Sequence, residues 1–341
     1  MYNKNVYKYD DMKRSEALAV RNTVGWYYFK HQLFEVTGED AGKFLDYVCT
    51  NRIDNLAVGR ERYTPILRED GTILDDVVVM RLEEDKYWVS TLFTERTSPA
   101  IKKHINGMDV DIEEDIDDEW HMYSVQGPRS LEMINAMVET PVDDLKFFSF
   151  AENRIGDMDV IINRAGFTGE KLGYEIYISG DYEEEIEEIL ASTAEKFGGK
   201  QVTDFQLMAL AIPTEKGFYY LRSLYRKNPF NVGLAKNINW DKDFVGKEAL
   251  LKTREEGPTH EMVGFTMKDH DVNIPHSAFG GPGAPVMLNG EEVGRVDKLT
   301  RSYVLETAIG VIYAKKGTLK VGDKATIRGY EAEIVEMPFV K

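Results

Sequence analysis

Asp75 and Asp76 are adjacent carboxylates at the start of an apolar segment, a place where they could carry out acid–base chemistry. The neighbouring residues 73–74 and 77–80 are apolar. Successive residues of a strand point to opposite faces, so we expect one carboxylate to face inward and the other outward. Desolvation would suit the inward carboxylate to handle protons or cationic intermediates. Alternatively, both are turn aspartates, because the polar segment 69–72 precedes them.

Glu175 is a second candidate, because it lies among large apolar residues directly after a glycine-rich segment. That segment, 166–173, contains Gly166, Gly169 and Gly173. A carboxylate held there can accept two hydrogen bonds from an amidine-like N–H edge, such as the edge of a pterin ring. Strand alternation alone leaves open that Glu175 is an exposed strand residue.

Other familiar catalytic and metal-binding patterns are absent from the sequence. Its 6 histidines form no HxH or HExxH pair, and its single cysteine, Cys49, ends an apolar stripe that predicts burial. The glycine-rich segment 280–283 lacks the Lys and Ser or Thr that follow in a phosphate-binding loop. No Gly-x-Ser-x-Gly motif indicates a serine hydrolase. We therefore expect neither a metal site nor a nucleophilic cysteine or serine.

The composition is that of a globular, acidic protein. The chain has 341 residues, 43% of them hydrophobic, and its 42 Lys and Arg against 59 Asp and Glu give a net charge of −17. Phosphate contacts need a basic face, so this charge argues against nucleic acid or an anionic membrane as a partner. No apolar run reaches the ~18 residues of a membrane helix, and the N-terminus has no secretory signal. We expect a cytoplasmic protein of two or three domains.

The elements expected around the candidate residues are a mixture of helices and strands. Apolar spacing predicts a helix over 41–48 and an acidic helix over 184–197 that is capped by Asp181. Residues 71–92 read as a hairpin. The dense acidic run 111–119 is interpreted as a solvated connection between domains.

The C-terminal part has the pattern of a small β domain. An Asn-Gly turn at 289–290 lies between apolar segments, and a similar turn is expected at 328–329. The last ~80 residues are therefore expected to form a β-barrel or sandwich.

Together, these motifs resemble those of the tetrahydrofolate-dependent aminomethyltransferase family, which includes the glycine-cleavage T-protein and folate-dependent demethylases. The resemblance extends over nearly the whole chain. The matching segments are Ala19-Val20-Arg21 with Val24-Gly25, Phe44-Leu45 with Thr50-Asn51, Gly71 to Asp76, Val125 to Pro128, Gly166 to Glu170 with Gly173-Tyr174-Glu175, Asp243 to Leu250, and Met337 to Val340.

The resemblance implies roles for individual residues and a tetrahydrofolate cofactor. Asp75 is implied as the catalytic residue beside the folate nitrogens, with Asp76 as the alternative. The implied cofactor-binding residues are Tyr63, Val77, Phe167 and Glu175, and Glu175 is the one that would hold the pterin. A substrate pocket is expected from His31, Tyr28 and Tyr220, although core packing of the tyrosines is the alternative.

The resemblance also implies an α+β, T-protein-like fold of three domains. A discontinuous folate-binding domain is expected over 1–50 and 120–240. A ferredoxin-like domain is expected as an insertion over 51–119. A linker and a C-terminal β-barrel are expected over 241–341.

Several positions depart from the family's motifs. Ala209 and Pro213 stand where the family's RDxLRLEAG helix has arginines, and Pro213 is expected to break or kink that helix. Phe167 replaces a tyrosine, and 297–303 replaces a TSGxxSP loop. These departures favour transfer of a methyl or similar one-carbon unit from a small methylated substrate to tetrahydrofolate.

Two other functions stay open. One is glycine-cleavage aminomethyltransferase activity on a lipoyl carrier protein. The net charge argues against that partner, because the carrier is itself acidic. The other is a non-catalytic folate-binding or regulatory protein on the same fold.

Overall fold

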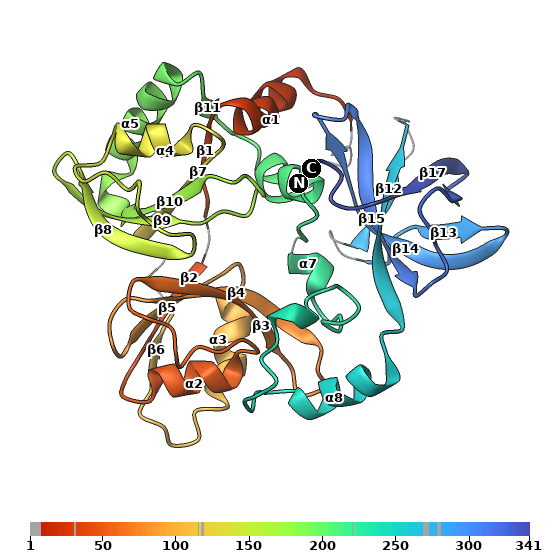
Figure 1. Cartoon of the computed structure of the whole chain (residues 1–341), viewed down its shortest axis with the longest axis horizontal. Coiled ribbons are helices and arrows are strands. Elements are labelled where there is room, and N and C mark those ends of the chain that lie inside the picture. The colour runs from red at the N-terminus through yellow and green to blue at the C-terminus, as the bar shows by residue number, and fades with distance from the viewer. Residues whose placement is uncertain are drawn as a thin grey trace.

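The structure is a computed structural model that describes residues 8–30, 32–114, 116, 119–219, 221–268, 273–277 and 281–341. Three lobes surround a central helical segment (Figure 1). Two lobes share one sheet of 11 strands, and the third is a closed barrel. We call them the first lobe, the second lobe and the barrel. No helix of the described residues is long and apolar enough to cross a membrane.

The shared sheet has the order β11-β1-β7-β10-β9-β8-β3-β4-β5-β2-β6. Its first-lobe strands are β1 (Gly25–Tyr28), β7 (Trp120–Gln126), β8 (Ser149–Ile155), β9 (Met158–Arg164), β10 (Gly173–Ser179) and β11 (Lys200–Gln201). Its second-lobe strands are β2 (Gln32–Thr37), β3 (Arg60–Leu67), β4 (Ile73–Arg81), β5 (Lys86–Thr91) and β6 (Asp111–Glu113). Between β8 and β3 the ladder is reduced to the pair Arg60 and Ser149, so the sheet divides there into the two lobes.

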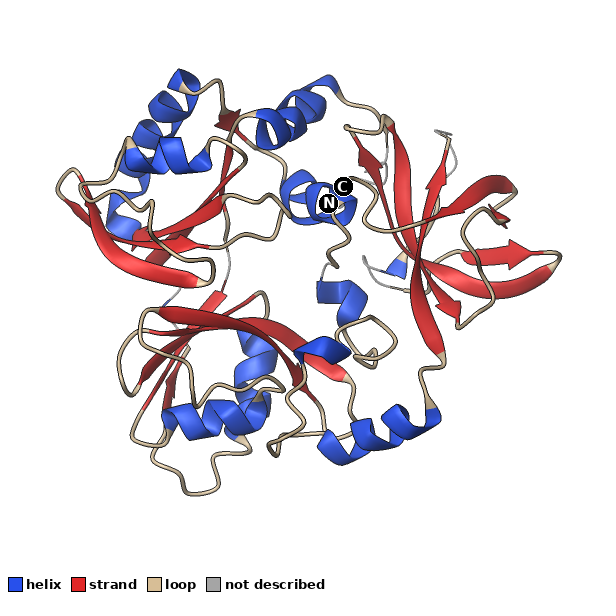
Figure 2. Cartoon of the chain, viewed as in Figure 1, coloured by secondary structure: helices blue, strands red, loops and turns tan. Residues whose placement is uncertain are grey.

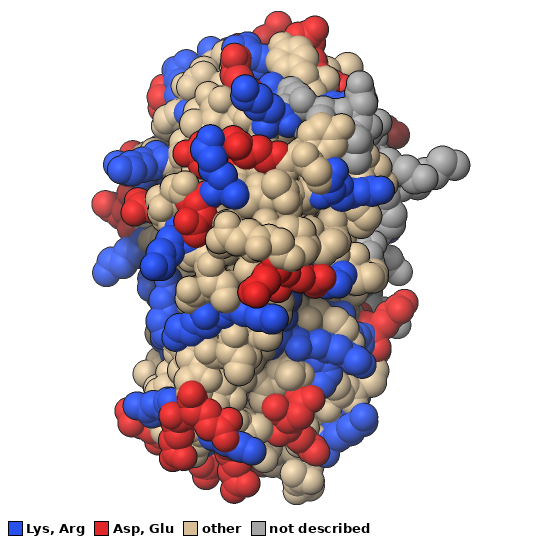
Figure 3. All heavy atoms as spheres, turned by 90° about the vertical axis from the view of Figure 1, so that its right-hand side faces the viewer, with Lys and Arg blue, Asp and Glu red and all other residues tan. Residues whose placement is uncertain are grey.

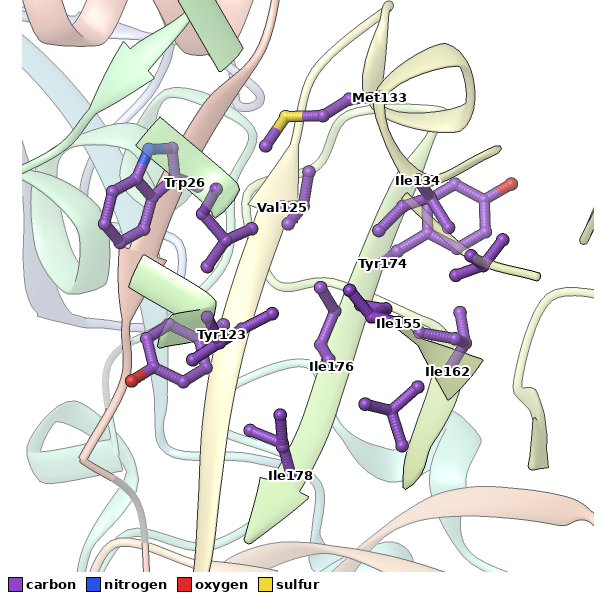
Figure 4. Close-up of a cluster of buried hydrophobic side chains, with 14 of the residues drawn as sticks. Trp26, Tyr123, Val125, Met133, Ile134, Ile155, Ile162, Tyr174, Ile176 and Ile178 are labelled. Carbon is purple, nitrogen blue, oxygen red and sulfur yellow. The ribbon is translucent and has the colours of Figure 1, made fainter. Parts of the chain in front are cut away.

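The first lobe packs helices on the outer face of its half of the sheet (Figure 2). These helices are α4 (Ser130–Asn135) and α5 (Glu183–Lys196), and α1 (Asp11–Asn22) lies at the β1 end. Figure 4 shows the core between sheet and helices, where Val125 of β7 and Ile176 of β10 lie near Met133 of α4. Helix α5 starts at Glu183, and Asp181 lies in the 3-10 turn before it, so Asp181 is not the predicted cap.

The second lobe confirms the helix expected over 41–48 and the hairpin expected over 71–92. Helix α2 (Ala41–Val48) buries the predicted apolar stripe, and β4 pairs antiparallel with β5. Helix α3 (Thr94–Lys102) lies beside α2 on the outer face. The acidic run is not a plain connection, because β6 (Asp111–Glu113) pairs with β2 at the sheet edge. Residues 115, 117 and 118 of that run lie outside the described residues.

The central segment links the lobes and keeps its helical course through Pro213. A π-helical turn, η3 (Leu207–Ala211), leads into α6 (Ile212–Glu215). The turn closes with the Ile212 N–H donating to the Leu207 carbonyl, and Pro213 follows in the first turn of α6. A proline is tolerated there because its missing N–H needs no helical partner, so the predicted break does not occur. Helices α7 (Leu221–Leu224), η4 (Ala235–Asn237) and α8 (Lys247–Glu256) complete the connection.

The C-terminal region confirms the expected barrel, closed in the order β12-β15-β14-β13-β16-β17. Its strands are β12 (His260–Met267), β13 (Pro285–Leu288), β14 (Glu291–Ser302), β15 (Thr307–Lys315), β16 (Lys324–Ile327) and β17 (Tyr330–Val335). Asn289 and Gly290 both have positive φ, of 51° and 86°, as the predicted two-residue hairpin turn requires. The chain then returns to the centre, where Val340 N–H donates to the Glu215 carbonyl at 2.9 Å.

The domain boundaries at 50, 119 and 240 stay a prediction. Strand β2 and helix α2 precede residue 50 but pack with β5 and the second-lobe core.

Candidate functional site

The two halves of the sheet face each other across the molecule, and the helices cover their outer faces (Figure 2). Side chains from both lobes meet between these inner faces in an apolar cluster. Members of this cluster include Phe29, Met80, Trp88, Ile161 and Tyr177, with Tyr27, Val78 and Phe167 half-buried beside them. Strand alternation over 77–80 of β4 directs Val78 and Met80 to this inner face and Val77 and Val79 to the outer core.

Asp76 lies on the inner face. Its Oδ2 accepts a hydrogen bond from the Tyr63 hydroxyl at 3.1 Å. Its Oδ1 is buried and has no hydrogen-bond partner among the described residues. Burial, and then the neighbouring Asp75, raise the pKa of Asp76 to about 7. Such a carboxyl group can take up or release a proton near neutral pH.

Asp75, the first choice from the sequence, points the other way into the second-lobe core. It is fully buried and accepts hydrogen bonds from the Thr91 hydroxyl at 2.6 Å and from the Thr97 hydroxyl. Its Oδ1 accepts the Asp76 N–H at 2.9 Å and lies 3.9 Å from Nη2 of Arg96. Burial raises the pKa of Asp75, and the two threonine hydroxyls oppose that rise. Both oxygens of Asp75 are therefore engaged within the lobe.

Both aspartates lie within strand β4, so the turn interpretation is wrong. The same alternation decides the position of Val77, which is 1% exposed and packs in the outer core with Asp75. Val77 therefore does not reach the face that carries Asp76, and its neighbour Val78 does.

Glu175 projects from β10 toward the second lobe. It is only 8% exposed, which excludes the exposed-strand alternative. Its Oε2 accepts hydrogen bonds from Asn163 Nδ2 at 3.0 Å and from the Tyr177 hydroxyl at 3.2 Å. Burial raises the pKa of Glu175, while these two donors lower it.

Glu61 is a site residue that the sequence analysis did not identify. The same Asn163 Nδ2 donates to Glu61 Oε2 at 2.7 Å, so one amide bridges two glutamates. Burial, and then Glu175, hold the pKa of Glu61 well above its usual range. Glu61 precedes Tyr63 by two residues on β3, and this period-2 spacing was the available signal.

Glu61 also connects the two candidate carboxylates. Glu61 and Tyr63 lie on one face of β3. Asn163 links Glu61 to Glu175 by hydrogen bonds to both. The Tyr63 hydroxyl is hydrogen-bonded to Asp76. Glu175 and Asp76 therefore lie on one continuous inner face that joins the lobes, and Asp75 does not.

The aromatic candidates divide between two places. The Phe167 ring lies 5.0 Å from that of Phe29 on the inner face. Tyr28 packs instead against His121 and Tyr123, with ring centroids 5.0 and 5.1 Å apart. Its neighbour Tyr27 is the residue of β1 that joins the inner cluster. His31 and Tyr220 lie outside the described residues.

A set of buried polar contacts fixes the loop before Glu175. Arg21 pairs with Glu170 and, at 2.9 Å, with Glu215, and it donates to the Thr168 carbonyl at 3.0 Å. Gln126 Oε1 accepts the Thr168 hydroxyl at 2.8 Å. A Cβ at Gly173 would stand 2.3 Å from Gln126 Oε1, so a larger residue there would displace the Gln126 amide. The loop is therefore rigidly held.

The surface hollows, possible metal ligands and the cysteine do not add to the site on the inner face. Two surface hollows of about 380 and 390 Å³ are lined by residues of α2 and its neighbours, and not by Asp76 or Glu175. No group of three or more His, Cys, Asp and Glu within the described ranges is placed to hold a metal. Cys49 is buried, and burial raises the pKa of its thiol to about 12.

The chemistry of the inner face fits a ligand with several N–H donors. The buried atoms without partners among the described residues of this face include Asp76 Oδ1, Glu61 Oε1 and Asn163 Oδ1. All of these are oxygens, and buried acceptors without donors are costly. The N–H edge of a pterin would supply donors of this kind.

Comparison with known proteins finds relatives along nearly the whole chain. Residues 1–242 match the family model of the GCVT N-terminal domain, and 260–341 match that of the glycine cleavage T-protein C-terminal barrel domain. An aminomethyltransferase of Halothermothrix orenii is 31% identical over 339 residues, which cover 95% of this chain and 90% of that protein. An aminomethyltransferase of a Thermotoga species is 29% identical over 337 residues, covering 96% and 89%.

A solved structure shares the fold. The glycine cleavage system aminomethyltransferase T from Bartonella henselae superposes with a TM-score of 0.82 at 21% identity, covering 96% of this chain and 89% of that one. This match confirms the expected α+β fold with its C-terminal barrel. With both family models matched in order, this chain belongs to the glycine-cleavage T-protein family of folate-dependent aminomethyltransferases.

Proposed function

We propose that this protein transfers a one-carbon unit from a small methylated substrate to tetrahydrofolate, with Asp76 as the catalytic carboxylate. The observation that carries the proposal is the buried Oδ1 of Asp76, which has no hydrogen-bond partner among the described residues and lies on the same inner face as Glu175. Asp75 is the weaker choice, because the threonines and the Asp76 N–H already occupy its oxygens.

Each residue of the inner face has a role in this proposal. Tetrahydrofolate, when bound, supplies the nitrogens that receive the one-carbon unit. Glu175 would accept hydrogen bonds from the N–H edge of the pterin, assisted by the nearby Glu61. Phe167, beside Phe29, would enclose the ring and exclude water.

Asp76 would hold or release the proton that the transfer requires. The Tyr63 hydroxyl engages Oδ2, so Oδ1 is left to face the reacting atoms. A pKa of about 7 allows both protonation states at neutral pH, which suits a group that serves as acid and base in turn.

The proposal is tested by incubating the protein with tetrahydrofolate and a panel of O-, S- and N-methylated compounds. Formation of methyl-tetrahydrofolate is expected with at least one compound. Failure with every compound, under conditions where tetrahydrofolate binds, would contradict the small-substrate proposal.

A second candidate is aminomethyl transfer from a lipoyl carrier protein. It is favoured by the curated relatives, which bear the name aminomethyltransferase at 31% and 29% identity. Net charge is a poor argument against it, because Figure 3 shows basic side chains interspersed with acidic ones on the face toward the barrel. Reconstitution with a lipoyl carrier decides between the two, since only this candidate predicts turnover there.

A further inference from the structure

A cluster of four arginines surrounds two aromatic rings next to the start of β4. The guanidinium carbons of Arg68 and Arg96 lie 4.4 and 4.3 Å from the centroid of the Tyr225 ring. Arg226 lies 5.6 Å from the same ring. Arg96 is also 4.3 Å from the Phe93 ring, with Arg222 at 6.0 Å from it. We call Arg68, Arg96, Arg222 and Arg226 the arginine cluster.

The backbone ties this cluster to the strand that carries Asp76. Arg226 N–H donates to the Ile73 carbonyl at 2.9 Å, and Ile73 N–H donates to the Lys227 carbonyl at 2.9 Å. Arg68 Nη1 donates to the same Ile73 carbonyl at 2.7 Å. The segment after α7 is thereby fixed against the first residue of β4, three positions before Asp76.

Within the cluster, Arg96 has hydrogen-bonding groups that the described residues leave unused. Among the described residues, the charge of Asp70 acts on Arg68 and Arg226, and the charges of Asp75 and Asp76 act on Arg96. Two of these three carboxylates already accept hydrogen bonds from other residues. Thr72 donates twice to Asp70, and the Thr91 hydroxyl donates to Asp75. Arg96 reaches Asp75 only at 3.9 Å, and its Nε and Nη2 are buried without hydrogen-bond partners in the part of the chain that the structure describes.

Such a cluster in a chain of net charge −17 needs an explanation. Like charges held close together repel, and buried guanidinium N–H groups without acceptors add a desolvation cost. Stacking on Phe93 and Tyr225 offsets part of that cost and fixes the guanidinium planes. An anion with two equivalent oxygens would satisfy the free N–H groups in the bidentate geometry that arginine favours.

We propose that the arginine cluster binds a carboxylate group of the one-carbon donor, so that the substrate of this protein is a methylated carboxylic acid. This inference rests on the proposed function and specifies its substrate class. Arg96 ties the cluster to β4, because its Nη2 lies 3.9 Å from Oδ1 of Asp75, the residue directly before Asp76. A donor held by its carboxylate would therefore extend its methylated end along β4 toward Asp76.

Tetrahydrofolate carries carboxylates of its own in its glutamate tail, so the test needs two arms. The first arm measures binding of two matched pairs without folate, benzoate against benzamide and methoxyacetate against methoxyacetamide. The second arm compares tetrahydrofolate triglutamate with tetrahydropteroate, which lacks the tail. Both arms use isothermal titration with the full-length wild type, the double variant Arg222→Gln/Arg226→Gln and the control Arg254→Gln.

Arg254 is a suitable control because it is an exposed arginine of α8 that lies 5.0 Å from the Trp240 ring, outside the cluster. We expect the carboxylate of at least one pair to bind the wild type and Arg254→Gln at least about tenfold more tightly than its amide. The double variant should lose this preference while its affinity for tetrahydropteroate is unchanged.

Two results would overturn the inference. One is equal binding of carboxylates and amides by the wild type. The other is a loss confined to tetrahydrofolate triglutamate in the double variant, which would assign the cluster to the folate tail. Failure of tetrahydropteroate to bind any of the proteins would instead overturn the proposed function. The carboxylate and amide pairs are measured without folate, so their result would still show whether the cluster binds a carboxylate.

Discussion

The Tyr63 hydroxyl donates a 3.1 Å hydrogen bond to Oδ2 of Asp76, and the other oxygen of that carboxylate is left buried without a partner among the described residues. Burial, and then Asp76, keep the pKa of Tyr63 well above its usual range, so the phenol stays a donor across the physiological pH range. The pair therefore orients a carboxyl group of pKa about 7 toward the space between the lobes.

Replacing Asp75 and Asp76 one at a time should separate an effect on catalysis from an effect on stability. Asp76→Asn should fold, bind tetrahydrofolate and lose about 100-fold or more in turnover, because it cannot exchange a proton. Asp75→Asn should instead lower the free energy of unfolding by about 1–3 kcal/mol, because one of its oxygens becomes an amide that cannot accept from Thr91 and Thr97.

Turnover assays and urea denaturation of both variants check this division. Equal loss of turnover with unchanged stability in the two variants would contradict it. The same turnover assay tests whether the protein is a non-catalytic folate-binding protein. In that case, neither the wild type nor Asp76→Asn would show turnover.

The raised pKa of Asp76 makes a prediction about stability and pH. Its folded-state pKa of about 7 exceeds the ordinary value of about 3.9, so the native state binds more protons than the unfolded state between these values. The free energy of unfolding contributed by this group therefore falls as pH rises from ~4 to ~7. Asp76→Asn should match the wild type near pH 4 and exceed its stability at pH 8 by about 1–3 kcal/mol.

Denaturant titrations at a series of pH values measure this difference directly. Glu61 and Glu175 titrate in both proteins, so their contribution cancels in the comparison. A difference that is absent at pH 8, or of opposite sign, would mean that Asp76 is ionised without cost in the folded protein.

Glu175→Gln should weaken tetrahydrofolate binding about 10- to 100-fold, because a charged acceptor for the pterin N–H edge is lost. Its fold should survive, since Gln retains an acceptor for Asn163 and Tyr177. The matched control is Glu184→Gln on the exposed face of α5, for which calorimetry should give the wild-type affinity. Equal affinity of all three proteins would remove Glu175 from the site.

Arg21→Ala should destabilise the protein by about 3–5 kcal/mol, because Glu170 and Glu215 would stay buried without their cation. Its side chain is 6% exposed, whereas that of Arg14, which pairs with Glu306, is 39% exposed. Arg14→Ala should therefore cost less than about 1 kcal/mol. Thermal and urea denaturation of both variants measure the contrast, and similar losses would show that Arg21 is not the link between these loops.

Elements with a local signal in the sequence were predicted well. The stripe at 41–48, the hairpin at 71–92 and the Asn289-Gly290 turn need only neighbouring residues to specify them, and all were confirmed. The break that was one of the two outcomes expected at Pro213 does not occur, because the π-helical turn ends at Ala211 and Pro213 falls in the first turn of the next helix.

The candidate site was harder to predict because it depends on orientation and on contacts between lobes. Alternation on β4 indicates that Asp75 and Asp76 face opposite ways, but only the packing of α3 and Thr97 decides which one faces the core. The role of Glu61 depends on Asn163, which is 102 residues away in the chain. No local pattern reports such a contact.

The account is tested most directly by a crystal structure of the protein with 5-formyltetrahydrofolate, a stable analogue of the bound cofactor. We predict that the pterin lies between the two halves of the sheet, with its N–H edge on Glu175 and Oδ1 of Asp76 within hydrogen-bond reach of its reactive nitrogens. A pterin bound outside this inner face, or one that contacts Asp75 while Asp76 points away, would contradict the account.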